Sequence, residues 1–118
     1  MDNTTLYPEL IDYIFEYQSK FMTKNEKAAQ WHGFAMEKSE NGSNKSLYNF
    51  FKERNLISFD KEVLALLKFG FKDFKEKVAT RIFKEHKDEL ELNTCPKCNK
   101  IARTTLAKQC RFCHHDWH

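Results

Sequence analysis

The sequence predicts a mostly α protein, with a domain of four or five helices over residues 1–91 and a small C-terminal β module over residues 92–118. Three observations favour this division. Glycine and proline are scarce, with three and two copies, and scarce turn-formers favour long helices over hairpins. Apolar side chains recur every three to four residues up to about His86. All four cysteines lie between Cys95 and Cys113, so the chain changes character near its C-terminus.

The first two helices are predicted by end signals as well as by spacing. A helix over residues 8–21 begins at Pro8, whose missing N–H would have no partner at a first helical position. Thr23 and Glu26 fit a capping box at the start of a second helix, which runs to about Lys38. The inward-facing positions of these helices are predicted to be Leu10, Ile11, Ile14, Tyr17 and Phe21, then Ala28, Trp31, Ala35 and Met36.

A polar segment separates the second helix from the third. Residues 39–46 are small and polar and are expected to form an exposed, mobile loop. The third helix is predicted over residues 47–54, with Ser46 as its cap, and Asn55 ends it. Leu47, Phe50 and Phe51 are expected to supply its buried side.

The fourth helix follows a cap at Ser58 or Asp60 and is expected to reach about Phe69. Gly70 fits a helix C-cap, where a positive φ is cheap only for glycine, or a mild kink in one longer helix. The apolar spacing then continues to about His86. Phenylalanine is abundant here and is most simply core, the alternative being a protein-binding groove. The positions are Phe50, Phe51, Phe59, Phe69, Phe71 and Phe74.

The cysteines form two C-x-x-C pairs, Cys95 with Cys98 and Cys110 with Cys113, separated by eleven residues. Two such turns supply the sulfur tetrahedron that Zn²⁺ prefers, with Zn–S distances of about 2.3 Å. A segment below ~40 residues buries too little apolar area to fold alone, so a metal would supply its folding free energy. Tetrahedral sulfur also suits iron.

Other uses of these cysteines fit the spacing less well. Two disulfides would normally staple the whole chain, yet no cysteine precedes Cys95. A redox dithiol needs only one pair, in a strand-to-helix context. Unrelated buried thiols seldom show paired spacing. Histidines at positions 32 and 86 are isolated, and those at 114, 115 and 118 are interpreted as surface residues, because four cysteines already close a structural site.

The tail resembles a zinc ribbon, a module in which two cysteine knuckles hold Zn²⁺. The resemblance covers residues 92–118 and implies a structural site with no open position for catalysis. Zinc ribbons usually carry glycine after each second cysteine, where this chain has Asn99 and His114. The whole chain is similar to small uncharacterised bacterial proteins with a helical front and a ribbon tail, which implies no activity. A small apolar cluster around the site is expected from Ile101, Leu106, Phe112 and Trp117.

The formal charge of +3 is unevenly distributed. Residues 1–92 hold 15 Lys and Arg against 16 Asp and Glu, whereas residues 93–118 hold five cations and one acid, Asp116. A positive patch on a compact module attracts phosphate backbones, although the charges could simply solvate it. If exposed, Phe112 or Trp117 could stack on a base. The candidate nucleic-acid-binding residues are Lys97, Lys100, Arg103, Lys108 and Arg111.

Several classes of protein are excluded or disfavoured. No apolar run approaches the ~20 residues that span a bilayer, so no membrane partner is expected. The opening residues 1–5 lack the order of a secretory signal, and an acidic first helix does not fit a transit peptide, so we expect a cytoplasmic protein. There is no phosphate loop, no G-x-S-x-G and no H-E-x-x-H.

The sequence therefore predicts a non-enzymatic, Zn²⁺-binding protein whose basic ribbon contacts nucleic acid or a nucleoprotein complex. The alternative is a protein–protein interaction adaptor with a purely structural zinc site, bound through its helical domain to a protein partner.

Overall fold

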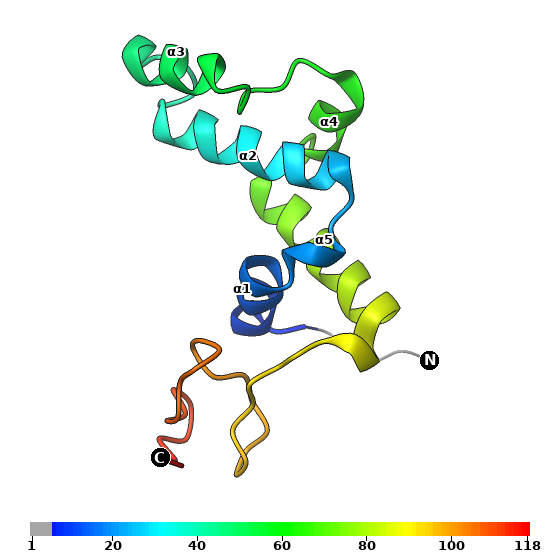
Figure 1. Cartoon of the computed structure of the whole chain (residues 1–118), viewed down its shortest axis with the longest axis vertical. Helices are drawn as coiled ribbons and strands as arrows, with labels where there is room; N and C mark the ends of the chain where they lie inside the picture. Colours follow the sequence, from blue (N-terminus) through cyan, green and yellow to red (C-terminus); the bar gives the residue numbers. More distant parts are fainter. Residues whose placement is uncertain (1–5) are drawn as a thin grey trace. The chain divides into compact units, whose positions relative to one another are not determined.

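Five α-helices form about half of residues 6–118, the part of the chain that the computed structural model describes (Figure 1). The opening residues 1–5, on which the expectation of a cytoplasmic location partly rests, lie outside the described part. The α-helices are α1 (Pro8–Tyr17), α2 (Lys24–Lys38), α3 (Lys45–Glu53), α4 (Lys61–Leu66) and α5 (Phe71–His86). Two 3₁₀ turns, Ser19–Phe21 and Lys87–Glu89, follow α1 and α5.

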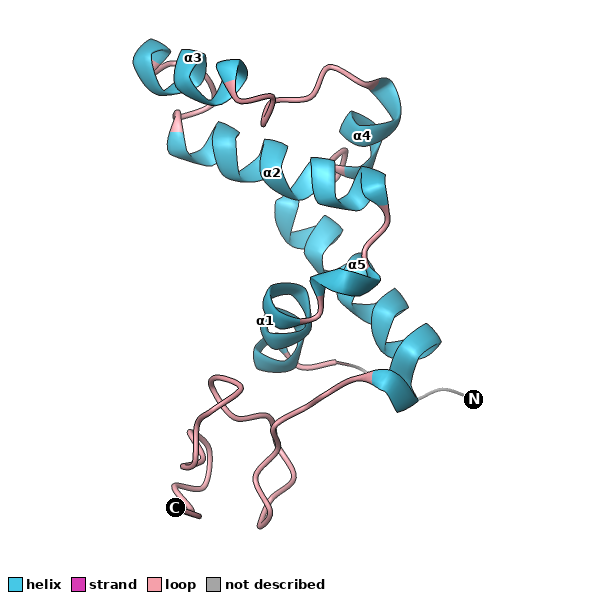
Figure 2. Cartoon of the chain, viewed as in Figure 1, coloured by secondary structure: helices cyan, strands magenta, loops and turns pink. Residues whose placement is uncertain are grey.

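The mostly α prediction is confirmed for the described residues, but the β module is not seen as strands (Figure 2). Within residues 6–118 the tail makes only two isolated antiparallel bridges, Thr94 with Ile101 and Gln109 with Asp116. Each bridge closes one cysteine turn. A single bridged pair per turn is too short to form a ladder.

Two compact units divide the chain, and each is described by itself. The terminal unit contains the described residues 6–21 together with residues 75–118, and the central unit contains residues 22–74. The division falls within α5 and differs from the sequence boundary between residues 91 and 92. The boundary between residues 91 and 92 rests on composition and stays a prediction.

The terminal unit has the richer core. Its buried apolar side chains come from α1, from the later turns of α5 and from the tail. Six of them are wholly inaccessible: Ile14, Ala79, Ile82, Cys95, Ile101 and Ala102. The apolar stripe predicted on α1 faces the core at Leu10, Ile11 and Ile14, but the prediction is wrong for Tyr17, which is exposed, and Phe21 is only half-buried. The helix ends at Tyr17 rather than Phe21, and the backbone tightens into a 3₁₀ turn instead.

In the central unit, α2 contacts both α3 and α4 (Figure 1). The predicted capping box is confirmed, because Thr23 Oγ1 accepts from Glu26 N–H and Glu26 Oε1 accepts from Thr23 N–H. Asp60 caps α4, as predicted.

The prediction of Ser46 as a cap is wrong, since Asn44 Oδ1 accepts from Leu47 N–H and α3 begins two residues earlier than expected. Asparagine caps at least as well as serine, so the earlier start is favourable.

Two further segments differ from the expectation. Residues 39–46 are not wholly exposed, because Ser39 and Gly42 are buried in a tight turn in which Gly42 N–H donates to the Ser39 carbonyl at 3.0 Å. The fourth helix stops at Leu66, after which the backbone bonds shift to a tighter spacing before Gly70 turns the chain at φ +97°. Gly70 therefore neither caps α4, whose C-cap is Leu67, nor kinks one longer helix, but separates the turn after α4 from the start of α5.

The largest error concerns the phenylalanines. Of the six that are predicted to be core, only Phe74 is buried. No residue of α3 is buried, and Trp31 on α2 is half exposed although its spacing predicts that it faces inward. Two of the six phenylalanines, Phe59 and Phe69, lie outside the α-helices and are 67% and 71% exposed.

Candidate metal centre

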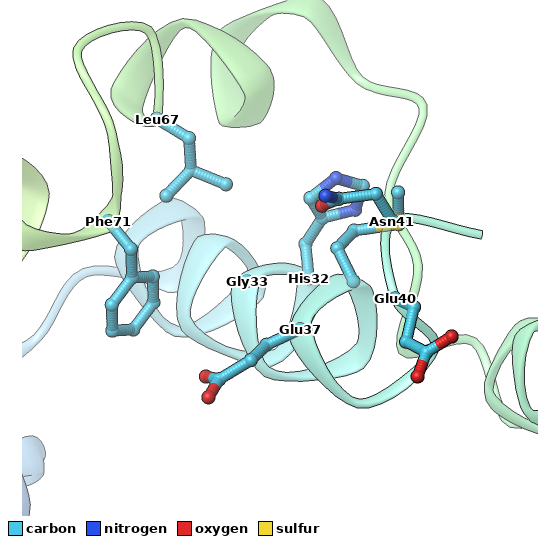
Figure 3. Close-up of a pocket in the computed structure, with 8 residues that line it drawn as sticks. His32, Gly33, Glu37, Glu40, Asn41, Leu67 and Phe71 are labelled. Carbon is cyan, nitrogen blue, oxygen red and sulfur yellow. The ribbon is translucent and has the colours of Figure 1, made fainter. Parts of the chain in front are cut away.

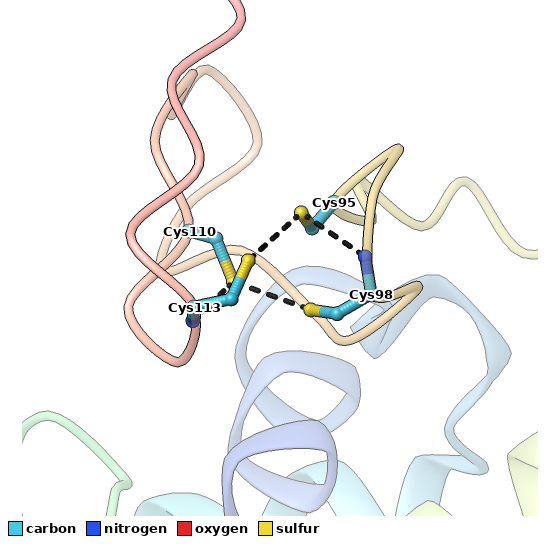
Figure 4. Close-up of side chains that lie close together, drawn as sticks. All are labelled: Cys95, Cys98, Cys110 and Cys113. Carbon is cyan, nitrogen blue, oxygen red and sulfur yellow. Dashed lines mark hydrogen bonds between the residues drawn. The ribbon is translucent and has the colours of Figure 1, made fainter.

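The first cysteine turn is built by backbone bonds around Cys95. The Cys95 N–H donates to Lys100 O at 2.8 Å, and Asn99 N–H donates back to Cys95 O at 2.8 Å. The bridge between Thr94 and Ile101 closes the turn at its base. These bonds fold the C-x-x-C segment so that both of its sulfurs project to one side (Figure 4).

The second turn repeats this arrangement fifteen residues later. The Cys110 N–H donates to His115 O at 2.8 Å, and His114 N–H donates to Cys110 O at 3.0 Å. The bridge between Gln109 and Asp116 closes this turn at its base, as the Thr94–Ile101 bridge closes the first turn. The backbone thus repeats over two segments whose sequences share little beyond the cysteines.

Left-handed backbone geometry completes both turns at the residues after the second cysteines. Asn99 has a φ of +64° and His114 a φ of +65°. These are the two positions at which zinc ribbons usually carry glycine. Asparagine tolerates this geometry well and histidine less so. At both positions the chain turns back toward the residue with which it forms the bridge at the base of the turn. Both positions therefore have left-handed backbone geometry without carrying glycine.

The four sulfur atoms converge on one point. All four Sγ atoms lie within 4.8 Å of one another. The distance from Cys95 Sγ to Cys113 Sγ is 3.7 Å, and that from Cys98 Sγ to Cys110 Sγ is 3.5 Å (Figure 4). Four sulfurs around a zinc ion at about 2.3 Å would be about 3.8 Å apart, whereas bonded disulfide sulfurs are about 2 Å apart. The spacing fits a shared metal ion and excludes disulfides in this arrangement.

Backbone N–H groups are aimed at the first cysteine of each pair. Cys95 Sγ accepts from Lys97 N–H at 3.4 Å and from Cys98 N–H at 3.5 Å. Cys110 Sγ accepts in the same way at 3.3 Å and 3.4 Å, from the N–H groups of Phe112 and Cys113. Such donors stabilise a thiolate, which is the form that binds a metal ion.

The thiol pKa values follow from this environment. The N–H of Cys113 is the largest influence on Cys110 and, with that of Phe112, lowers the pKa of Cys110 to about 6. For Cys98, the Lys100 N–H acts to lower the pKa, but burial and the other sulfurs outweigh it and raise the pKa to about 11. Without a cation, four neighbouring thiols cannot all ionise together. A divalent cation would remove that conflict, so the donor set suits a soft, tetrahedral metal.

The terminal unit supports the first turn through side chains that sequence reasoning missed. Tyr7 Oη accepts from Ile101 N–H at 2.9 Å, and Tyr13 Oη accepts from Asn93 N–H at 3.3 Å. Gln18 Nε2 donates to Glu91 O at 3.2 Å. These bonds join residues more than 70 positions apart, so no local pattern in the sequence could indicate them.

The predicted apolar cluster is only partly formed. Ile101 is fully buried, and Phe112 and Trp117 are half-buried, but Leu106 is 86% exposed. Leu106 lies in the connection between the two turns and is not packed into a core. The prediction that it belongs to the apolar cluster around the site is therefore wrong.

The five candidate nucleic-acid-binding residues all lie on or between the two turns. Lys97, Lys100, Arg103 and Lys108 are exposed, and Arg111 is half-buried. The structure brings two of them to one ring, since Lys100 Nζ lies 4.8 Å and Arg111 Cζ 5.9 Å from the centre of the Phe112 ring. The acid of this segment, Asp116, is hydrogen-bonded to His118.

The tail histidines do not join the sulfur cluster. Among residues 6–118, the four cysteines form the one group of three or more metal-binding side chains. The His115 carbonyl accepts a hydrogen bond from Cys110 N–H in the second turn, and the His115 ring stacks on Trp117. The interpretation of these histidines as residues outside the metal site agrees with this geometry.

A separate cavity of about 560 Å³ lies in the central unit (Figure 3). Its walls include His32 and Gly33 from α2, Asn41 from the following turn, and Leu67 and Phe71. His32 is tethered, because its Nδ1 accepts from Ser58 N–H at 3.0 Å. The neutral imidazole therefore carries its proton on Nε2.

The central unit is expected to lose stability in acid through His32. Burial lowers the pKa of His32 below its usual value of 6.5, so the unfolded chain takes up a proton more readily than the folded chain. The contribution of neutral His32 to the free energy of unfolding is fully present above about pH 6.5 and declines as the pH falls. NMR titration of the ring protons should give a pKa below 6.5. In His32→Asn, which keeps an acceptor for Ser58, the free energy of unfolding should fall less between pH 7 and pH 5. An equal fall in both proteins would contradict this.

The described part of the chain therefore contains a four-cysteine cluster that could hold a metal ion. Among residues 6–118, no helix combines the length and apolar character that crossing a membrane requires. Compared with models of protein families, with curated proteins and with solved structures, the chain matches none.

Proposed function

We propose that this is a non-enzymatic zinc protein in which Cys95, Cys98, Cys110 and Cys113 hold one Zn²⁺ in a ribbon-like arrangement. The sulfur spacing and the paired turns support this assignment. Four thiolates would fill a tetrahedron and leave no position for a water molecule or substrate, so the role of the metal would be structural. The zinc would supply the cohesion that a tail without strands lacks.

The proposed role of the tail is contact with nucleic acid or a nucleoprotein complex. The observation that carries it is charge: residues 93–118 hold five cations, four of them exposed, and the one acid is engaged by His118. Phosphate contacts by Lys and Arg release counterions, so binding of this kind weakens steeply with salt. It positions the protein on a phosphate backbone and carries no sequence information.

Charge reversal tests this role. In the triple variant Lys100→Glu, Arg103→Glu and Lys108→Glu, the affinity for a short DNA duplex or single-stranded RNA should fall at least about tenfold at low salt. The slope of log affinity against log salt should shrink by about 0.9 for each duplex phosphate that the variant no longer neutralises. An electrophoretic mobility series over salt measures both quantities.

A matched control reverses Lys24, Lys61 and Lys72, which are exposed lysines outside the tail. This control makes the same change in net charge and should retain most of the binding. If the zinc-loaded wild-type protein binds neither DNA nor RNA at low salt, or if both triple variants lose affinity equally, the tail is not the contact site.

The second candidate function is an adaptor that binds a protein partner through its helical part. The observation that favours it is the set of exposed aromatic side chains in the central unit, which includes Trp31, Phe34 and Phe59. An adaptor of this kind would be indifferent to the tail charges and sensitive to the aromatic positions.

A further inference from the structure

The helix α3 is amphipathic, but none of its residues is fully buried. Leu47, Phe50 and Phe51 recur at helical spacing on one side, yet Leu47 and Phe50 are each 37% exposed and Phe51 is only half-buried. A surface helix normally turns such a stripe toward a core. In this unit the stripe instead extends an apolar surface that begins on α2.

The neighbouring surface of α2 is also aromatic. Trp31 and Phe34 are 50% and 40% exposed and meet edge to face, with ring centres 5.9 Å apart. Phe34 meets Phe51 of α3 in the same way at 5.9 Å, and Phe51 stacks on Phe50 at 5.4 Å. These rings form a continuous chain across two helices. We call this chain, together with Leu47, the aromatic patch.

Cations border the aromatic patch. Lys38 Nζ lies 5.7 Å from the centre of the Phe34 ring, and Arg54 Cζ lies 3.6 Å from that of Phe50. Lys27 is exposed one helical turn before Trp31. The sequences that carry the patch, residues 27–38 and 45–54, have net charges of +1 and +2 even with their acids counted.

The chemistry of this surface discriminates among possible occupants. Nucleic-acid bases need open ring faces for stacking, but here cations lie over Phe34 and Phe50. Phe50 is also stacked on Phe51, and Trp31 meets Phe34 edge to face. A second copy of the chain would oppose like patches and bring cations against cations. An amphipathic segment with apolar anchors and flanking carboxylates satisfies both the apolar rings and their basic border.

We propose that the aromatic patch is the docking surface for an acidic, amphipathic helical segment of a protein partner. The inference extends the adaptor function by naming the surface and the partner's chemistry, and it holds whether or not the tail binds nucleic acid. Apolar side chains spaced three to four residues apart would lie across α2 and α3. Carboxylates beside them would meet Lys38 and Arg54.

Selection from a displayed library of random 16-residue peptides against the whole zinc-loaded protein tests the proposal. The recovered peptides should carry apolar residues at helical spacing and an excess of Asp and Glu. Their affinity should fall at least about tenfold in Phe34→Ser/Phe50→Ser, as for the loss of central aromatic anchors. It should also fall in Lys38→Glu/Arg54→Glu. Phe69→Ser, which changes an aromatic that is 71% exposed in the same unit but outside the patch, should bind normally.

The contrary outcomes are distinct. No enriched peptide, a basic consensus, or peptides unaffected by the patch variants would each overturn the docking proposal. Single-stranded oligonucleotides that compete with the peptides would identify nucleic acid as the occupant instead. Concentration-dependent dimers that disappear in the Phe34 and Phe50 variant would identify a second copy. Because all these variants leave the tail unchanged, the failure of this proposal can be separated from failure of the nucleic-acid role.

Discussion

Removal of the metal is expected to unfold residues 93–117. The two cysteine turns contribute two isolated bridges and few buried side chains, whereas binding of structural Zn²⁺ supplies about 10 kcal/mol or more of folding free energy at neutral pH. After chelation, the amide resonances of this segment should collapse into the narrow range of an unfolded chain. Two-dimensional NMR of the labelled protein measures this residue by residue.

The central unit provides the internal control for chelation. Its helices contain no cysteine and are organised by their own caps, so the amide resonances of residues 22–74 should keep their dispersion. Cys110→Ser should reproduce the effect of chelation on the tail, because it removes the sulfur that accepts two backbone N–H groups. A tail that keeps its dispersed spectrum without metal would show that the chain alone holds this arrangement.

Ile101→Ala is expected to weaken metal binding severely. Ile101 is fully buried and directly follows the first cysteine turn, so truncation creates a cavity that costs about 2–5 kcal/mol. In the proposed zinc site, folding of the tail is coupled to metal binding, so the cost should appear in the metal affinity, which is expected to fall about 30-fold or more. Competition with a chromophoric chelator measures the change.

Leu106→Ala is the matched control for that variant. It removes a similar amount of apolar side chain from the same segment, but Leu106 is 86% exposed and should change the affinity by less than about twofold. The backbone bond from Ile101 N–H to Tyr7 Oη survives in both variants. Equal losses in the two proteins would mean that burial around the site does not contribute to binding.

Local signals in the sequence predict several helix starts and the cysteine turns, whereas the predicted helix ends at Phe21 and Phe69 lie too far along the chain. Thr23 with Glu26, and Asp60, act as caps because their side chains bond to backbone groups only two or three residues away. The left-handed positions Asn99 and His114 are also local to one turn, but it is the resemblance to zinc ribbons that marks them, because glycine usually occupies both places. Features whose partners lie within one turn can be inferred from the residues themselves.

Features that depend on distant partners cannot be inferred in this way. Helical spacing shows that Phe50 and Phe51 share a side of α3, but not whether another element covers that side. Their interpretation as core assumes such a cover, and the structure leaves them open. Similarly, no local pattern identifies Tyr7 and Tyr13 as supports of the metal site, since their hydroxyl groups bond to backbone 94 and 80 residues away.

The two proposed binding surfaces differ in chemistry and are expected to act independently. The tail offers exposed cations on and between the two cysteine turns, which suits phosphates. The aromatic patch offers apolar rings bordered by cations, which suits an acidic amphipathic helix. A protein with both could link a nucleic acid to a protein partner, and the tail and patch variants separate the two activities.

The central claim is that four sulfurs hold one zinc ion, and X-ray absorption at the zinc edge, together with metal emission spectroscopy on the purified protein, tests it most directly. The account predicts one zinc per chain, surrounded by four sulfurs at about 2.3 Å. A substoichiometric metal content, or a first shell containing oxygen or nitrogen in place of any of the four sulfurs, would contradict it.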